Sequence, residues 1–479
     1  MKMLQVFNNF FTALHAENII FCNWKGHSDI KKHLNGDGDI DLYVSINQKT
    51  KFEEIAKVSG FRRVTSYQAS HDYIEHYYGL DKSQTIFVHI HVYFKIITGE
   101  HISKNYELPI ENYLILNMDT SSPPLSTMSV SAKHSIFLIR YFLKIGSMYG
   151  LMQYFREFSK YSNEWQSFDH NFNYESLPEL SISVNEFKEM HKVYESSSFI
   201  KKLFFSIKFK KKLIKFRRRR FFDYHIFTIN NLIIRSINKF FLKKQKILSP
   251  GIVVAICGLD GSGKSSLVSS LQNHFSEYFN TTVFHLGRPS SNILTFVFNA
   301  FVSVYSFVRR LKPFRKTSDS EMIRKNVSLV YAIRSVLLAY DRKVQSNKAF
   351  KYSRKGYLVI CDRYPGLENG KMDSPRILID KSKGFIYQFC YNLEQNLYKS
   401  INPAEFIFQL SVPLDVAIHR NRLRAKYGKE TEDELRERFA LNSGVKFLGK
   451  NYHHIDATPP FDFVLKQVID ELWNSDDWS

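Results

Sequence analysis

The stretch "GIVVAICGLDGSGKSSLVSSL", residues 251–271, decides the fold of the second half of the chain. An apolar run at 252–257 predicts a buried strand, and Leu267 and Leu271 stand one helical turn apart after a glycine-rich loop. The loop matches the pattern G-x-x-x-x-G-K-[ST] with Gly258, Gly263, Lys264 and Ser265. In such a loop, backbone N–H groups surround a β-phosphate, the lysine reaches the β and γ oxygens, and the hydroxyl ligates Mg²⁺. The start of the following helix also attracts the anion.

This motif predicts ATP and Mg²⁺ as cofactors, with Lys264 as a catalytic residue and Ser265 as a metal ligand. The alternative is a tight strand-to-helix turn that matches the pattern by chance. The residues expected to hold the nucleotide are Gly258, Gly261, Ser262, Gly263, Lys264, Ser265 and Ser266.

A second motif is "GYLVICDRY", residues 356–364, which predicts a buried strand ending in Asp362, Arg363 and Tyr364. The carboxyl ends of parallel strands line the ligand crevice of an open sheet. Asp362 can there hold the water shell of Mg²⁺, and Arg363 can clamp a second phosphate with two hydrogen bonds. A salt bridge at the end of a strand is the alternative interpretation.

The third element is "PLDVAIHRNRLRAKYG", residues 413–428, a predicted helix that carries Arg420 and Arg424 on one face. Such arginines suit a lid that closes over phosphates and stabilises charge on the transferring group. A solvated basic face explains the same pattern without any function.

Together with "LLAYDR" (337–342), these motifs resemble the thymidylate kinase family over residues 250–475. The resemblance implies a doubly wound parallel sheet and transfer of the ATP γ-phosphate to a (d)TMP-like nucleoside monophosphate. It implies that Asp260 faces the acceptor and is catalytic, as are Asp362, Arg363, Arg420 and Arg424. Because Gly261 follows Asp260, the loop has no arginine of its own, which is similar to the subgroup whose catalytic arginines lie in the lid. The substrate-binding residues that it implies are Asp260, Arg288, Arg342, Arg363 and Tyr364.

Three departures concern the acceptor. Leu338 stands where the family stacks an aromatic ring on the base, "HLGRPSSN" (285–292) keeps Arg288 without the family's glutamate, and "PGLENGKMDSP" (365–375) differs from the family's segment. Two alternatives therefore remain. One is a kinase for a sugar or polysaccharide precursor that acts together with an N-terminal nucleotidyltransferase activity. The other is a nucleotide-binding regulatory protein without small-molecule turnover.

The N-terminal region has its own chemical signal, "NGDGDIDLYV" (35–44). Asp39 and Asp41 are two residues apart on a predicted strand, so both point to one face and form a second candidate metal site. With Lys25 and Gly26 upstream, residues 1–118 resemble the nucleotidyltransferase fold. The family's third carboxylate has no match here, because the later strand offers His89 and His91, and His27 separates Gly26 from Ser28. An aspartate-rich turn into an ordinary strand, or a non-catalytic form of the fold, are the alternatives.

These patterns predict an α/β chain of four parts: an α+β nucleotidyltransferase-like domain (1–118), a helical domain (119–200), a basic linker (201–249) and a P-loop kinase domain (250–479). The apolar run 292–308 predicts a buried helix, since it is too short and too polar to span a membrane.

The 479-residue chain has a formal net charge of +21, which predicts attraction to anions unless it reflects biased composition alone. Residues 201–220 contain eleven Lys or Arg and no acid, as counted in the sequence. This segment suits an anionic membrane surface or a solvated connecting helix, and nucleic acid less well. Four cysteines without metal-type spacing, and a polar N-terminal helix, predict a cytoplasmic protein, peripheral to the membrane if the basic segment binds lipid. A small-molecule substrate and a homodimer are the other expected partners.

Overall fold

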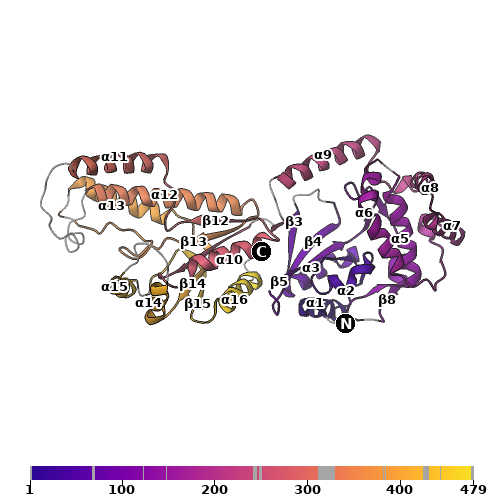
Figure 1. Cartoon of the computed structure of the whole chain (residues 1–479), viewed down its shortest axis with the longest axis horizontal. Coiled ribbons are helices and arrows are strands. Elements are labelled where there is room, and N and C mark those ends of the chain that lie inside the picture. Colours follow the sequence, from indigo (N-terminus) through magenta and orange to yellow (C-terminus); the bar gives the residue numbers. More distant parts are fainter. Residues whose placement is uncertain are drawn as a thin grey trace. The chain divides into compact units, whose positions relative to one another are not determined.

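The computed structural model describes residues 3–66, 71–121, 123–146, 148–240, 245–247, 251–310, 329–380, 382, 384–423, 431–442 and 444–475. Contacts divide the chain into two compact units, Met1–Lys246 (unit 1) and Ile247–Ser479 (unit 2), shown in Figure 1. The predicted mixed α/β class is confirmed. The division into four parts stays a prediction.

Unit 2 is built on a five-stranded sheet in which every neighbouring pair is parallel. Its strands, in spatial order, are β12 (Thr281–His285), β13 (Leu358–Asp362), β11 (Ile252–Gly258), β14 (Ala404–Ser411) and β15 (Gly449–Asp456). All seven residues of the central strand β11 are buried. A parallel sheet needs cover on both faces, which explains why the predicted strands are continuous apolar runs instead of alternating ones. The expectation of a parallel sheet is confirmed.

Helices cover both faces of this sheet. Helix α10 (Lys264–Ser276) contacts β11–β13 and α16 (Phe461–Asn474), while α12 (Leu329–Ser353) contacts the same strands and α13 (Phe385–Lys399). Figure 1 shows α12 and α13 on one side of the strands and α10 and α16 on the other. Two shorter helices, α14 (Leu414–Leu423) and α15 (Glu432–Leu441), pack together beyond the carboxyl end of β14.

The prediction of a buried helix at 292–308 is right about the helix and wrong about the burial. Helix α11 (Ile293–Arg310) packs against α12, and Thr295 is buried, yet most of the apolar side chains described in this helix are exposed. Within the described part of the chain, α11 makes its main contact with α12, and the apolar side chains on its other face stay exposed. The exposed side chains include Ile293 (82%), Phe296 (68%) and Phe301 (69%).

Unit 1 contains a mixed six-stranded sheet in the order β1 (Phe21–Asn23), β2 (Asp39–Val44), β5 (Ile86–Tyr93), β4 (Ile74–Asp81), β3 (Phe61–Ser66) and β10 (Gln245–Ile247). Strands β2 and β5 are parallel, and β4 is antiparallel to both β5 and β3. Side chains such as Ile40, Leu42 and Ile90 form a core with α1 (Gln5–Ala16) and α3 (Lys49–Val58). Since side chains alternate along a strand, Asp39, Asp41 and their neighbours at period two face away from that core.

The rest of unit 1 is mainly helical and surrounds α5 (Val130–Lys144), which contacts α6 (Met148–Gln166), α7 (Val184–Glu195) and α8 (Phe199–Lys212). The remaining elements are α2 (Ile30–His33), α4 (Glu111–Leu116), α9 (Phe221–Phe240), the pairs β6 (Ile96–Thr98) with β7 (Tyr106–Leu108) and β8 (Met118–Asp119) with β9 (Thr127–Met128), and the short helices His27–Asp29, Ile46–Gln48, Pro178–Leu180 and Ile214–Phe216. Among the described helices, none has both the length and the apolarity needed to cross a membrane.

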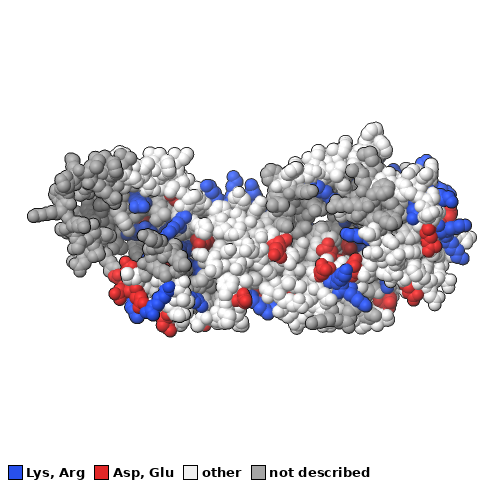
Figure 2. Space-filling view, in the orientation of Figure 1, with Lys and Arg blue, Asp and Glu red and all other residues white. Residues whose placement is uncertain are grey.

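The basic segment 201–220 is tied into unit 1 through several of its cations. Lys210 is buried and lies 2.7 Å from Glu100, and Arg218 lies 2.9 Å from Asp72. Figure 2 shows Lys and Arg side chains gathered with acidic ones over the α7–α8 end of unit 1. Internal pairing therefore accounts for part of the basic run, and its binding to lipid stays a prediction.

Candidate functional site

The glycine-rich loop joins the end of β11 to the start of α10, as its pattern predicts. Gly258 has φ 140°, and a Cβ there would lie 2.4 Å from the carbonyl oxygen of Leu410, so only glycine fits. Gly263, at the N-cap of α10, has φ 91°. The following Lys264 is 5% exposed, and its Nζ donates to the carbonyl oxygen of Leu259 at 2.7 Å. Burial and the nearby cation Arg363 lower the pKa of Lys264 to about 8, which still leaves most of it charged at pH 7.

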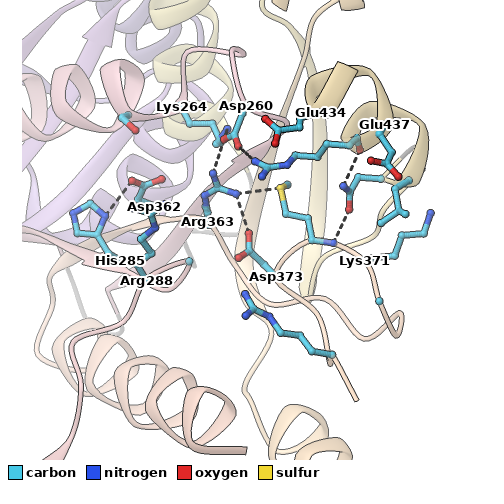
Figure 3. A pocket seen from close by; sticks show the side chains of 18 of the residues that line it. Asp260, Lys264, His285, Arg288, Asp362, Arg363, Lys371, Asp373, Glu434 and Glu437 are labelled. Atoms are coloured by element: carbon cyan, nitrogen blue, oxygen red, sulfur yellow. Dashed lines mark hydrogen bonds and ion pairs between the residues drawn. The ribbon is translucent and has the colours of Figure 1, made fainter. Parts of the chain in front are cut away.

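The loop opens into a cavity of about 1010 Å³ whose wall is dominated by charged side chains (Figure 3). A volume of this size is at the upper end of the range for small-molecule and cofactor sites. The lining residues are Asp260, Lys264, Ser265, His285, Gly287, Arg288, Asp362, Arg363, Gly370, Lys371, Met372, Asp373, Arg376, Asn421, Glu434, Glu437, Arg438, Leu441 and Asn442.

Asp260 is the anionic centre of this cavity. Its two carboxylate oxygens accept from Arg363 Nη2 at 2.6 Å and from Arg438 Nη1, and Lys264 Nζ lies 3.6 Å away. Burial alone would raise the pKa of Asp260, but the three cations outweigh it and lower the pKa to about 2. Asp260 is therefore ionised at every physiological pH and holds Arg363 and Arg438 beside the P-loop. Figure 3 shows the pair of Asp260 and Arg363.

A second acid, Asp373, links two arginines. It accepts from Arg363 Nη1 at 3.3 Å and from Arg342 Nη2 at 2.7 Å. Arg342 is completely buried and also donates from Nε to the carbonyl oxygen of Leu286 at 3.0 Å. Asp373 thus fixes the guanidinium of Arg363 from the side opposite Asp260.

Two residues implied as substrate contacts lie outside the cavity lining. Arg342 is enclosed by backbone carbonyls and Asp373, and Tyr364 is fully buried, with its hydroxyl donating to the carbonyl oxygen of Asn402 at 2.7 Å. Neither has a surface that a bound molecule can contact in this structure. At these two positions the motifs "LLAYDR" and "DRY" therefore supply buried residues that support the structure around the cavity.

Asp362 and Ser265 both line the cavity near the P-loop. Asp362 ends β13 and its Oδ2 lies 3.0 Å from Nδ1 of His285, which occupies the paired position on β12. Ser265 is exposed at the first turn of α10. Of the remaining nucleotide-binding candidates, Ser266 is exposed, while Gly261 and Ser262 are buried within the loop.

The arginines predicted for the site differ in whether they line the cavity. Arg288 is exposed and lines the cavity. Arg420 donates from Nη2 to the carbonyl oxygen of Ala457 at 2.8 Å and is not part of the lining. Arg424 lies outside the described residues. In the part of the chain that the structure describes, the helical arginine at Asp260 is Arg438 of α15.

Sequence reasoning missed Arg438, Asp373 and His285. Arg438 is 178 positions from Asp260, and no local spacing links them. A capping box at Thr431 and Glu434 marks the start of α15, but it does not indicate which side chain of that helix faces the loop. Asp373 stands in the segment "PGLENGKMDSP", which the family resemblance left without a role.

In unit 1, Asp39 and Asp41 lie on one face of β2, opposite two histidines of β5. Asp39 Oδ1 lies 2.6 Å from His89 Nδ1, and Asp41 Oδ1 lies 3.3 Å from His91 Nδ1 and 2.9 Å from Lys25 Nζ. The structure thus surrounds the predicted acidic pair with imidazoles and one ammonium group.

The ionisation of this group follows from its packing. Burial would raise the pKa of Asp39, but the neighbouring histidines lower it to about 2. Burial, with His91 and His89 close by, lowers the pKa of His76 to about 2. Burial and His89 also lower the pKa of His91, so the carboxylate is charged and these two imidazoles are neutral at pH 7.

The low pKa of Asp260 makes a testable contribution to acid stability. An unfolded Asp titrates at about 3.9, so ionised Asp260 stabilises the fold above about pH 4, and this contribution is lost as the pH falls towards 2. It amounts to about 2 kcal/mol at pH 7. We expect the free energy of unfolding of unit 2 to fall by about 2 kcal/mol more in the native chain than in Asp260→Asn between pH 5 and pH 2. Pulsed hydrogen exchange of β11 peptides in a urea series measures this difference, and equal losses in both proteins would contradict it.

Comparison with known proteins gives partial similarities. No family model matches the chain. It is 26% identical over 225 residues to the "Uncharacterized ATP-binding protein YghR" of Escherichia coli K12, covering 46% of this chain and 85% of the relative. It is also 26% identical over 227 residues to the "Uncharacterized ATP-binding protein YghS" of the same strain, covering 46% and 92%. A deoxyadenosine kinase from M. mycoides with bound dATP aligns over 47% of this chain and 100% of that one at 15% identity, but its TM-score of 0.27 supports no conclusion. Over nearly half its length, the chain is thus similar to two proteins named for ATP binding, and it carries a P-loop at the carboxyl end of the central strand of a parallel sheet.

Proposed function

We propose that unit 2 is an ATP-dependent phosphotransferase that moves the γ-phosphate to a small anionic acceptor. One observation carries this proposal: Lys264 and Ser265 of the P-loop line the same cavity as Arg288, Arg363 and Arg438. Cations beyond the loop can bind a second anionic group or compensate charge on the phosphate during transfer, and both roles belong to phosphotransfer. The two relatives named for ATP binding, and the resemblance to thymidylate kinases, support the same assignment.

The oxygen donors present fit a magnesium ion. Ser265 offers an exposed hydroxyl at the start of α10, and the carboxylate of Asp362 lines the same cavity. Mg²⁺ prefers oxygen ligands and keeps several waters, so Ser265 would bind it directly and Asp362 through water. When bound, the ion neutralises charge on the phosphates.

The side chains divide into two groups by what they face. Lys264 and the loop N–H groups hold the β- and γ-phosphates, while Arg363 and Arg438, fixed by Asp260, face the acceptor. An acceptor oxygen then forms a bond to the γ-phosphorus as the bond to the β–γ bridging oxygen breaks, leaving ADP. The protein contributes positioning and compensation of charge.

The acceptor implied by the family resemblance is a (d)TMP-like nucleoside monophosphate. One observation favours a second class, a phosphorylated sugar or polysaccharide precursor. Among the described residues that line the cavity, none is Phe, Tyr or Trp, so these walls offer no large ring for stacking a base. Leu338, in place of the family's aromatic residue, agrees with this.

A panel of acceptors with γ-labelled ATP and Mg²⁺ tests the proposal. The panel contains dTMP, the other nucleoside monophosphates and a set of sugar phosphates, and labelled products are separated by chromatography. Label on dTMP supports the family's activity, and label on a sugar phosphate supports the second class. ATP binding with hydrolysis but no labelled acceptor contradicts phosphotransfer to the tested molecules and favours a regulatory nucleotide switch.

The catalytic arginine that we propose from the cavity, Arg438, differs from the arginine that the lid motif predicts, Arg420. Arg438→Ala removes a cation held at Asp260 inside the cavity, so we expect kcat/KM to fall by about 100-fold. Arg420→Ala removes a bond to the carbonyl oxygen of Ala457 outside the lining, so we expect a loss below about threefold and a slightly lower Tm. Steady-state kinetics of both variants with the labelled acceptor decide between them. A larger loss in Arg420→Ala would show that α14 supplies the catalytic arginine.

A further inference from the structure

Three histidines of unit 1 meet on one face of its sheet. His76 lies on β4 directly opposite His91 of the antiparallel strand β5, and His89 lies two residues before His91. One ring nitrogen from each histidine lies within 4.8 Å of one nitrogen of each of the other two, and His76 Nδ1 is 3.2 Å from His89 Nε2. Two nitrogens that bind one tetrahedral zinc ion at 2.0–2.1 Å are about 3.4 Å apart, so the spacing of the His76 and His89 nitrogens already matches a shared metal ion, and the His91 nitrogen lies within 4.8 Å of both.

The two aspartates of β2 orient this cluster. Parallel pairing of β2 and β5 sets Asp39 across from His89 and Asp41 across from His91. Each carboxylate faces the Nδ1 of its histidine, at 2.6 Å for Asp39 and 3.3 Å for Asp41. An Nδ1–H that donates to a carboxylate leaves the Nε2 lone pair for a metal, which is the arrangement that aligns histidine ligands in zinc sites.

The surroundings favour the imidazoles over the carboxylates as ligands. Lys25 places its ammonium 2.9 Å from Oδ1 of Asp41, the same oxygen that faces Nδ1 of His91, and donates to the hydroxyl of Tyr93 at the same distance. The charge of this carboxylate is therefore already balanced by an ammonium group. Nitrogen donors select zinc and related transition metals over Mg²⁺. The side chains of His89 and His91 are 10% and 21% exposed, so the cluster is enclosed yet reachable from solvent.

We propose that His76, His89 and His91 bind one divalent transition metal ion of the zinc class, with Asp39 and Asp41 as positioning residues. Three imidazoles leave the fourth tetrahedral position for water or an anionic group, as in catalytic zinc sites. This assignment differs from a carboxylate-bound pair of metal ions, because here the aspartates hold the ligands and not the ion. It is independent of the phosphotransfer proposed for unit 2.

Metal titration of the full chain tests the assignment. The protein is stripped with a chelator and titrated with Co²⁺, whose visible absorption reports tetrahedral geometry, and zinc content is measured after dialysis against Zn²⁺. We expect one equivalent of metal with tetrahedral bands. His76→Ala, His89→Ala and His91→Ala should each weaken binding by more than about 100-fold. The control His191→Ala, a histidine of α7 paired with Glu195, should bind as the native chain does.

If a histidine variant fails to fold, two further measurements still test the proposal. X-ray absorption at the zinc edge of the native chain counts ligands, and we expect three imidazoles and one oxygen at about 2.0 Å. A shell of oxygens with one imidazole or none overturns the proposal. Asp39→Asn should weaken binding by about 10–100-fold without abolishing it. If Asp39→Asn and Asp41→Asn abolish binding while the histidine variants retain it, the ion sits on the carboxylates and the proposal is wrong.

Discussion

Replacement of Lys264 by Ala is expected to lower kcat for phosphotransfer by about 10²–10³-fold, the largest effect of any single change in unit 2. Lys264 is nearly buried at the start of α10, and its Nζ already lies against the loop carbonyl of Leu259. A phosphate in the loop offers this ammonium a stronger partner, and alanine removes the only lysine of the motif. Initial rates with labelled ATP and the acceptor found in the panel measure the loss.

A matched control separates this effect from a general loss of charge. Lys399 ends α13 and is exposed, so Lys399→Ala should keep the native rate. Equilibrium binding of a fluorescent ATP analogue should weaken in Lys264→Ala and not in the control. Native rates in Lys264→Ala would mean that the loop is not a phosphate site.

Arg363→Lys should reduce kcat/KM for the acceptor by about 100-fold although the charge is kept. Arg363 uses both ends of its guanidinium, Nη2 toward Asp260 at 2.6 Å and Nη1 toward Asp373 at 3.3 Å. A lysine presents one compact charge and cannot span two carboxylates in a fixed plane. Because the group faces the acceptor, we expect the KM for the acceptor to rise far more than the KM for ATP.

The control here is Arg354→Lys, an exposed arginine after α12, which should match the native chain. Kinetics with each substrate varied in turn give the two KM values. A lower Tm with unchanged kinetics would show that Arg363 only stabilises the fold. An equal rise in both KM values would place it at the nucleotide instead of the acceptor.

Several features of unit 2 were predictable because their signals are local. The P-loop follows from eight adjacent residues, 258–265, and the parallel sheet follows from apolar runs that alternate with helical patterns. The helix at 293–310 was also predictable, since the spacing of its apolar residues lies within one short stretch of sequence. Its exposure was not, because burial depends on how many neighbours cover α11, and the packing against α12 leaves one apolar face open.

In unit 1, the sequence by itself determined that Asp39 with Asp41, and His89 with His91, would each share a face, since strand side chains alternate with period two. Only the tertiary structure decided that the two pairs lie opposite each other and that His76 joins them. Strand order and register depend on how whole strands pair and pack against the core. The local spacing of residues therefore does not predict them. The same holds in unit 2, where Arg438 reaches Asp260 across 178 positions because α15 packs beside the loop. Motifs therefore identify the chemistry available in each unit, and packing selects the side chains that meet to perform it.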